Sequence, residues 1–188
     1  MTALLFLCFL PISSPATQAA QQDWTALTDK LYQALRYDDW DTFQHFMKKA
    51  DSNLVNDFHN LRFKPRGAFI GGNLFRAIVH CRANTIGYQV VAKLRTSVAE
   101  DRFVADYLNH IDDQDGLTFL GWLKMRAQSL NFDAPHDWEE LRKDALVLQN
   151  FRVMGAKVEC ELDPEFPCTE EFDPWLFWIA EELKSRVK

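Results

Sequence analysis

The chain has 188 residues, of which 47% are apolar, 13% aromatic and 26% charged, and its formal net charge is −6. The apolar fraction is too high for a disordered chain, and seven glycines with seven prolines are too few for a collagen-like, low-complexity or turn-rich all-β protein. A sequence pI of about 5.3 argues against a general nucleic-acid-binding protein, and the length predicts a single domain.

The first part of the chain has the features of an export signal. Residues 1–22 contain no charged side chain, and the apolar run at residues 3–10 is followed by small and polar residues. This order is typical of a secretory signal peptide, although the Lys or Arg that usually precedes the apolar run is missing. We therefore expect residues 1–20 to be a signal peptide and the protein to be periplasmic or secreted; a disordered tail or a short buried segment is the alternative. The run is too short for a membrane span.

Residues 21–188 form the predicted domain, in which apolar residues recur at intervals of three and four, the spacing of helices. The first helix has its apolar face at residues 24–35, and Asp23 is placed to cap its start. A second short helix follows Asp38 and Asp39. The tight connection between the two predicts a helical hairpin.

Helical spacing continues to the C-terminal end, with two interruptions. We expect a long loop over residues 51–71 and an acidic turn over residues 112–116. The pattern Asp137-x-x-Glu140 resembles a capping box at the start of a long helix, and a last helix is expected to begin at Asp173. Since no run shows the alternation of a strand, the predicted fold class is all-α.

Two stretches resemble the ankyrin repeat. The first hairpin follows the second half of the consensus, with Ala34 at its Ala, Asp38-Asp39 at its Gly-His turn, Phe43 at its Val, Phe46-Met47 at its Leu-Leu and Ala50 at its Gly. A later unit resembles the first half as Asp113-x-x-Gly116-x-Thr118-Phe119-Leu120, and Gly155-Ala156 stands where a repeat ends. No unit has the complete Thr-Pro-Leu-His tetrapeptide, and the last unit is longer than the consensus.

This resemblance implies an ankyrin-like α-solenoid of stacked helical hairpins, with an irregular helical bundle as the alternative. Ankyrin-like proteins generally bind other proteins and are generally not enzymes. The resemblance therefore implies an exported protein-binding module that restrains its partner, as an inhibitor or an immunity protein. The alternatives are a small envelope hydrolase or lyase using Asp38, Asp39 and Asp41, and a structural assembly factor of the envelope.

The region from Val158 to Asp173 contains seven acidic residues and no basic one. It is either a solvated loop or an acidic surface that binds a basic partner, such as a toxin or an enzyme. The candidate partner-binding residues come from this region and from the acidic turn: Asp113, Asp115, Glu161, Asp163, Glu165 and Phe166. The basic run from Arg62 to Arg66 could bind an anion or be an ordinary exposed loop.

The cysteines and histidines show no metal or cofactor motif. Once the leader is removed, an oxidising compartment favours a disulfide between Cys160 and Cys168 and leaves Cys81 as a buried thiol. No phosphate-binding glycine loop, hydrolase serine motif or zinc-binding helix is present, and residues 113–116 keep only part of a calcium loop. We therefore expect no cofactor, no metal and no catalytic residue.

Overall fold

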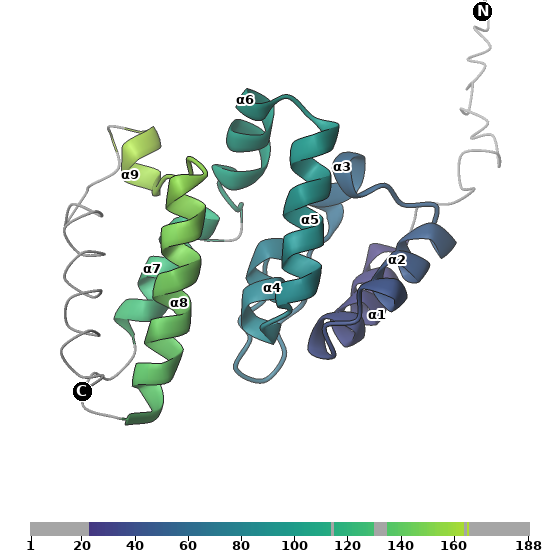
Figure 1. Ribbon diagram of the computed structural model, residues 1–188, viewed down its shortest axis with the longest axis horizontal. Helices are drawn as coiled ribbons and strands as arrows, with labels where there is room; N and C mark the ends of the chain where they lie inside the picture. The colour runs from purple at the N-terminus through teal and green to yellow at the C-terminus, as the bar shows by residue number, and fades with distance from the viewer. Residues whose placement is uncertain (1–22, 114, 130–134, 164, 166–188) are drawn as a thin grey trace, which may run out of the picture.

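The computed structural model describes residues 23–113, 115–129, 135–163 and 165. Regular structure within these ranges is helical, without a β-strand, so the all-α prediction is confirmed. The helices drawn in Figure 1 are α1 (Trp24–Arg36), α2 (Trp40–Lys49), α3 (Leu54–Asp57), α4 (Leu74–Cys81), α5 (Asn84–Ser97), α6 (Glu100–Arg102), α7 (Phe119–Gln128), α8 (Pro135–Val153) and α9 (Glu159–Leu162). A 3-10 helix, Phe58–Asn60, follows α3, and a π-helix, Phe103–Leu108, follows α6.

Some expected features lie outside the described residues. They are the signal peptide at residues 1–20, the last helix from Asp173, and the side chains of Phe166 and Cys168. None of the helices in the described part of the chain has the length and hydropathy that a membrane crossing requires.

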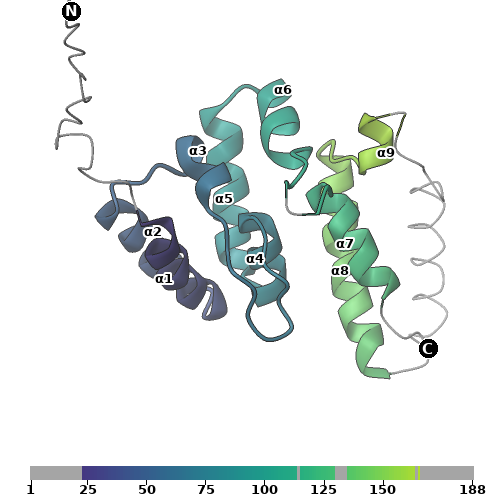
Figure 2. The same ribbon diagram turned by 180° about the vertical axis from the view of Figure 1, so that it is seen from behind.

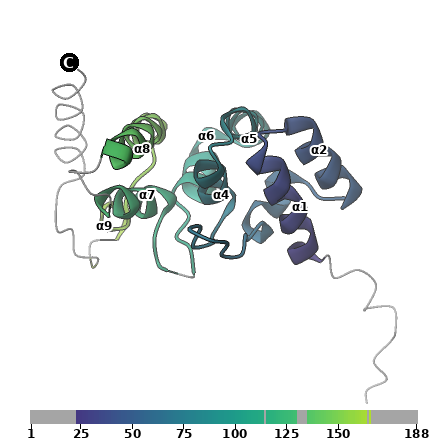
Figure 3. The same ribbon diagram turned by 90° about the horizontal axis from the view of Figure 1, so that it is seen from below.

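The helices pair into hairpins that lie side by side. The pairs α1/α2, α4/α5 and α7/α8 each pack against each other, as the view from behind in Figure 2 also shows. Between hairpins, α1 contacts α4, α4 contacts α7, and α2 contacts α5. Seen from below in Figure 3, the helices form two rows, one of α1, α4 and α7 and the other of α2, α5 and α8.

Local capping explains where four of these helices begin. The backbone N–H of Ala26 donates to Asp23 at the start of α1, and Thr42 N–H donates to Asp39 at the start of α2, each at 3.0 Å. The first cap confirms the role that the sequence predicts for Asp23, and the second shows which of Asp38 and Asp39 caps α2. The later helices α4 and α7 begin in the same way, with caps from Asn73 and Thr118.

Helix α5 takes its cap from another hairpin. Its own preceding residue, Ala83, makes no side-chain capping bond. Instead, the carboxylate of Asp38, in the α1–α2 turn, accepts hydrogen bonds from the backbone N–H groups of Thr85 and Ile86, each at 2.9 Å. Asp38 has a positive φ of 52°, a conformation that Asp tolerates better than most residues. The turn of the first hairpin is thus bonded to the start of α5, the second helix of the second hairpin.

We expect Asp38→Ala to lower the free energy of unfolding by about 1–2 kcal/mol, because two helix-start amides lose their acceptor. Asp38→Asn should lose less, since the amide keeps one acceptor oxygen and tolerates the positive φ. The measurement is urea unfolding followed by circular dichroism. Asp41→Ala, in the exposed first turn of α2, is the matched control. Equal stability of the Asp38→Ala and Asp41→Ala variants would contradict the role of this cap.

A row of aromatic rings joins the second hairpin to the third in the core. The ring centroids of Phe58 and Phe75 lie 5.0 Å apart, those of Phe75 and Phe119 lie 5.6 Å apart, and those of Phe119 and Phe151 lie 4.7 Å apart. The first three rings are almost completely buried. Burial of each contributes about 2–3 kcal/mol, so this row is a main source of cohesion between the two hairpins.

The prediction of a long loop over residues 51–71 is partly wrong. The segment contains α3 and the 3-10 helix. The chain then reverses direction in a loop closed by two isolated antiparallel β-bridges, Phe63 with Gly72 and Arg66 with Phe69. We call residues 61–73 the first loop.

The predicted capping box at Asp137-x-x-Glu140 is wrong, because α8 begins earlier, at Pro135. Glu140 therefore lies inside the helix, where its carboxylate pairs with Arg126.

Candidate functional site

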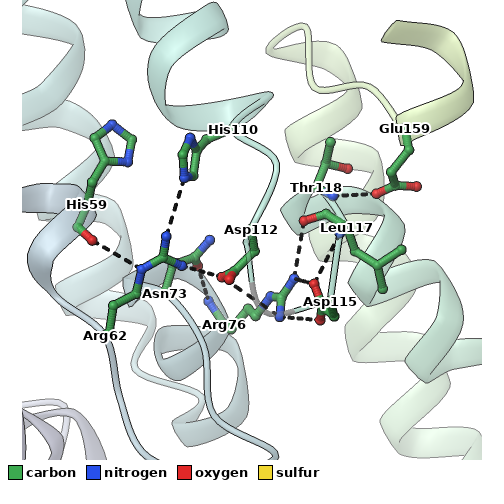
Figure 4. Close-up of polar contacts among 10 residues, drawn as sticks. All are labelled: His59, Arg62, Asn73, Arg76, His110, Asp112, Asp115, Leu117, Thr118 and Glu159. Carbon is green, nitrogen blue, oxygen red and sulfur yellow. Dashed lines mark hydrogen bonds and ion pairs between the residues drawn. The ribbon is translucent and has the colours of Figure 1, made fainter. Parts of the chain in front are cut away.

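A cluster of buried polar groups centres on the side chain of Arg76, in the first turn of α4 (Figure 4). Its side chain is only 1% exposed, and its two terminal nitrogens donate to the carboxylate of Asp115 at 2.6 and 2.9 Å. A further bond of 3.3 Å reaches the carbonyl oxygen of Leu117, and the guanidinium lies over the ring of Trp122 at 5.4 Å. Arg76 thereby fastens the acidic turn to the second hairpin.

A second arginine shares a buried carboxylate with Arg76. Asp112 is fully buried, it pairs with Arg62, and one of its oxygens lies 4.0 Å from Arg76 Nη1. Arg62 Nε also donates to the carbonyl oxygen of His59 at 3.1 Å, and Arg62 Nη2 lies 3.4 Å from His110 Nε2. Figure 4 shows that Asp112 lies between the two guanidinium groups. The acidic turn is therefore bonded to the first loop as well as to α4.

Two histidines pack together beside this cluster. The ring centroids of His59 and His110 are 4.3 Å apart, and Tyr107 stacks on His59. Burial lowers the pKa of both imidazoles, the positive charge of Arg62 lowers both further, and that of His110 also lowers the pKa of His59. Nearby carboxylates, Asp106 for both rings and the acidic turn for His110, act in the opposite direction. The neutral forms are thus favoured in the folded protein.

This pair predicts that stability falls as the pH drops below about 6.5, the ordinary histidine pKa. Since the folded-state pKa lies below that value, the unfolded chain binds more protons, and folding loses free energy between about pH 6.5 and the lowered pKa. Urea midpoints at pH 7.5 and 5.5 measure the loss. The loss of stability between these two pH values should be smaller in a His59→Gln/His110→Gln variant. A His45→Gln control, at an exposed position on α2, should behave as wild type. The same pH dependence in all three would contradict this assignment.

The start of α7 is bonded forward to α9. The backbone N–H of Thr118 donates to the carboxylate of Glu159, which is 7% exposed, and the Thr118 hydroxyl donates to the carbonyl oxygen of Lys157 at 2.9 Å. Gly121 makes this approach possible, because a Cβ there would lie 2.0 Å from the Glu159 carboxylate. Asn109 also accepts a hydrogen bond of 2.7 Å from the backbone N–H of Lys157, just before α9.

The structure divides the predicted partner-binding residues into two kinds. Asp115 is bonded to Arg76, and Glu161 is bonded to Arg152 at 2.7 Å, so both carboxylates hold parts of this chain together. The other three described residues, Asp113, Asp163 and Glu165, are exposed, as are Asp115 and Glu161. Because Asp115 and Glu161 have internal cationic partners, they contribute less to the charge available to another protein.

The cysteines lie apart from this cluster. Cys81 is free and half-buried at the end of α4, and burial raises the pKa of its thiol. Cys160 packs beside the core on α9, and its pairing with Cys168 stays a prediction. Within the described residues, no three His, Cys, Asp or Glu side chains are grouped so that they could hold a metal ion.

No family model, curated protein or solved structure matches the chain. Two carboxylates considered for a hydrolase or lyase have structural bonds: Asp38 caps α5 and Asp39 caps α2.

The central cluster was missed in the sequence. One signal could have found it: Arg76 is the only charged residue in the otherwise apolar run of residues 74–79. A charged residue in an apolar run implies a buried partner, but the sequence offers no means of choosing Asp115 and Asp112 among 27 acidic residues.

Proposed function

We propose that this chain is an exported protein-binding module built as an ankyrin-like stack of helical hairpins, and that it restrains a partner as an inhibitor or immunity protein. The observation that carries the proposal is the pair of polar ties between successive hairpins. Asp38 of the first hairpin caps α5 of the second, and Arg76 of the second binds Asp115 just before the third. Such ties favour a regular stack over an irregular bundle.

Corresponding residues at the second and third hairpins support this arrangement. Asn73 accepts a bond from the N–H of Arg76 at 3.1 Å, and Thr118 accepts one from the N–H of Gly121 at 3.0 Å, both three residues further on. Thr118 stands at the consensus Thr in the resemblance described above. The inserted short helices, α3 and α6 with their 3-10 and π extensions, account for spacings longer than the ~33 residues of an ankyrin unit.

The first hairpin has the surface of a stack's end. On α1 the exposed residues include Ala26, Lys30 and Gln33, whereas Leu27, Leu31 and others on the opposite face are buried. Terminal units of repeat proteins need such a polar outer face to remain soluble. This supports a stack that begins at α1.

A stack of this kind offers extended surface to a partner, with loops projecting from rigid helices. The exposed carboxylates Asp113, Asp163 and Glu165 give this surface negative charge, which suits a basic partner and speeds its association. The two internally bonded carboxylates, Asp115 and Glu161, keep the flanking segments in place.

Affinity purification from the periplasmic fraction, followed by mass spectrometry, tests the proposal. We expect one partner at near-stoichiometric level, and loss of that partner in a triple variant with Asp113, Asp163 and Glu165 each changed to Lys. The matched control is Asp101→Lys, at an exposed position on α6. Absence of a stoichiometric partner with the wild-type chain would overturn the proposal, and equal capture by the triple variant would place the contact elsewhere.

A further inference from the structure

A surface depression lies between the start of α1 and the first loop. It has a volume of about 430 Å³ and is open to solvent. The residues around it include Trp24 from α1, His59 from the 3-10 helix, and Arg62, Phe63, Lys64 and Pro65 from the first loop.

The charge of this depression is opposite to that of the whole chain. Its lining includes two permanent cations, Arg62 and Lys64, and no carboxylate, whereas the net charge of the protein is −6. Among the ion pairs of the described residues, Lys64 takes part in none. Asp112, the counter-ion of Arg62, is fully buried on the inner side, so it is not itself open to a ligand.

Arg62 is held in place before any ligand arrives. Its Nε is bonded to the His59 carbonyl oxygen and it pairs with Asp112, yet 26% of its side chain remains exposed. A guanidinium has five N–H donors, so donors remain for a further acceptor. Because the side chain is already fixed, binding a carboxylate costs little additional conformational entropy.

The first loop is also rigid. Phe63 and Gly72 exchange two backbone hydrogen bonds, of 2.8 and 3.0 Å. Arg66 pairs with Asp29 and lies over the ring of Tyr32 at 4.8 Å, which ties the loop to α1. The depression is therefore preformed, with the fixed Arg62 guanidinium and the exposed Lys64 beside an apolar wall.

We propose that this depression binds an acidic segment of the protein partner, with a carboxylate at Arg62 and Lys64 and an adjacent apolar or aromatic side chain against Trp24. Arginine binds carboxylates through directed, charge-assisted bonds, and half-buried tryptophan is a common anchor at interfaces. The inference rests on the proposed function, since it adds a second contact region and the chemistry of the partner segment that fits it.

The test selects random 12-residue peptides displayed on phage against the full chain, and measures the selected peptides by fluorescence anisotropy. We expect the selected sequences to place Asp or Glu beside an aromatic or aliphatic residue. Lys64→Glu should weaken their binding by about tenfold or more, because it puts a negative charge at the depression. Lys48→Glu, an exposed position on α2, is the matched control and should leave affinity within about twofold. Lys64 is on the surface, so the variant should keep its fold.

The other outcomes separate this inference from the proposed function. Basic peptides that depend on Asp113 or Glu165, and bind equally to the Lys64→Glu variant, would overturn the inference and leave the proposed function standing. Self-association of the wild type that Lys64→Glu abolishes, seen by sedimentation, would assign the depression to a second copy of this chain and overturn the partner assignment. No enriched peptide at all would count against both.

Discussion

Replacing Arg76 with alanine is expected to lower the free energy of unfolding by about 3–5 kcal/mol. The side chain is 1% exposed and neutralises Asp115 through two hydrogen bonds, and it lies beside the fully buried Asp112. Its removal takes a positive charge away from the buried Asp112 and leaves the Asp115 carboxylate without these two donors. Since small domains have about 5–15 kcal/mol of total stability, the variant should unfold at much lower urea concentration.

A matched arginine separates this effect from a general loss of charge. Arg95 pairs with Glu100 at 3.1 Å, but both side chains are about half exposed. Arg95→Ala should therefore cost no more than about 1 kcal/mol, and Arg76→Lys should fall between the two because it keeps the charge but not the paired donors. An Arg76→Ala midpoint equal to that of Arg95→Ala would contradict the role given to this cluster.

Gly72→Ala should lower the free energy of unfolding by about 2–4 kcal/mol for two reasons. Gly72 has a φ of +129°, which side-chain-bearing residues rarely adopt, and a Cβ there would lie 2.4 Å from Cδ of Arg76. The added methyl group would displace a side chain that is fixed by the Asp115 carboxylate. The measurement is again the urea midpoint, compared with wild type.

Gly116→Ala controls for backbone strain alone. Its φ is +69°, but a Cβ at that position would have no heavy atom within 4 Å. We expect a loss of about 1 kcal/mol for this variant. If the two alanine variants are equally stable, the contact between Gly72 and Arg76 does not constrain the fold as described.

The first hairpin could be predicted from sequence because its signals are local. Helical spacing and capping residues act within a few positions, and Asp23 caps α1 as expected. The expected acidic turn is closed by a bond of 2.8 Å from the Gly116 N–H to the Asp112 carbonyl oxygen. Each of these features depends on nearest neighbours along the chain.

The cluster around Arg76 could not be predicted, because its members are brought together only by packing. Asp38 was considered for catalysis, although its carboxylate caps a helix of the next hairpin. Glu161 was expected to contact a partner, but Arg152 binds it within this chain. Composition and spacing show how many charges a segment carries, and they do not show which are neutralised by residues far along the sequence.

The π-helix is a similar case. Helical spacing predicted an ordinary helix from about residue 100, and Phe103, Tyr107 and Leu108 are buried as that spacing requires. The wider turn places Tyr107 where its hydroxyl donates to the carbonyl oxygen of Val55 at 2.9 Å and its ring stacks on His59. These contacts are made with residues far from Tyr107 in the sequence, so the helical spacing of the segment could not predict them.

Site-specific photo-crosslinking in cells tests the central claim, partner binding by a helical stack, most directly. A benzophenone amino acid is placed singly at Asp113 and Glu165, and at Tyr88 on α5 as a control that is 74% exposed and lies away from the proposed contacts. The account predicts that one protein is crosslinked from Asp113 and Glu165 and is absent or weak from Tyr88. Equal labelling of many proteins from all three positions, or no crosslinked protein from any, would contradict it.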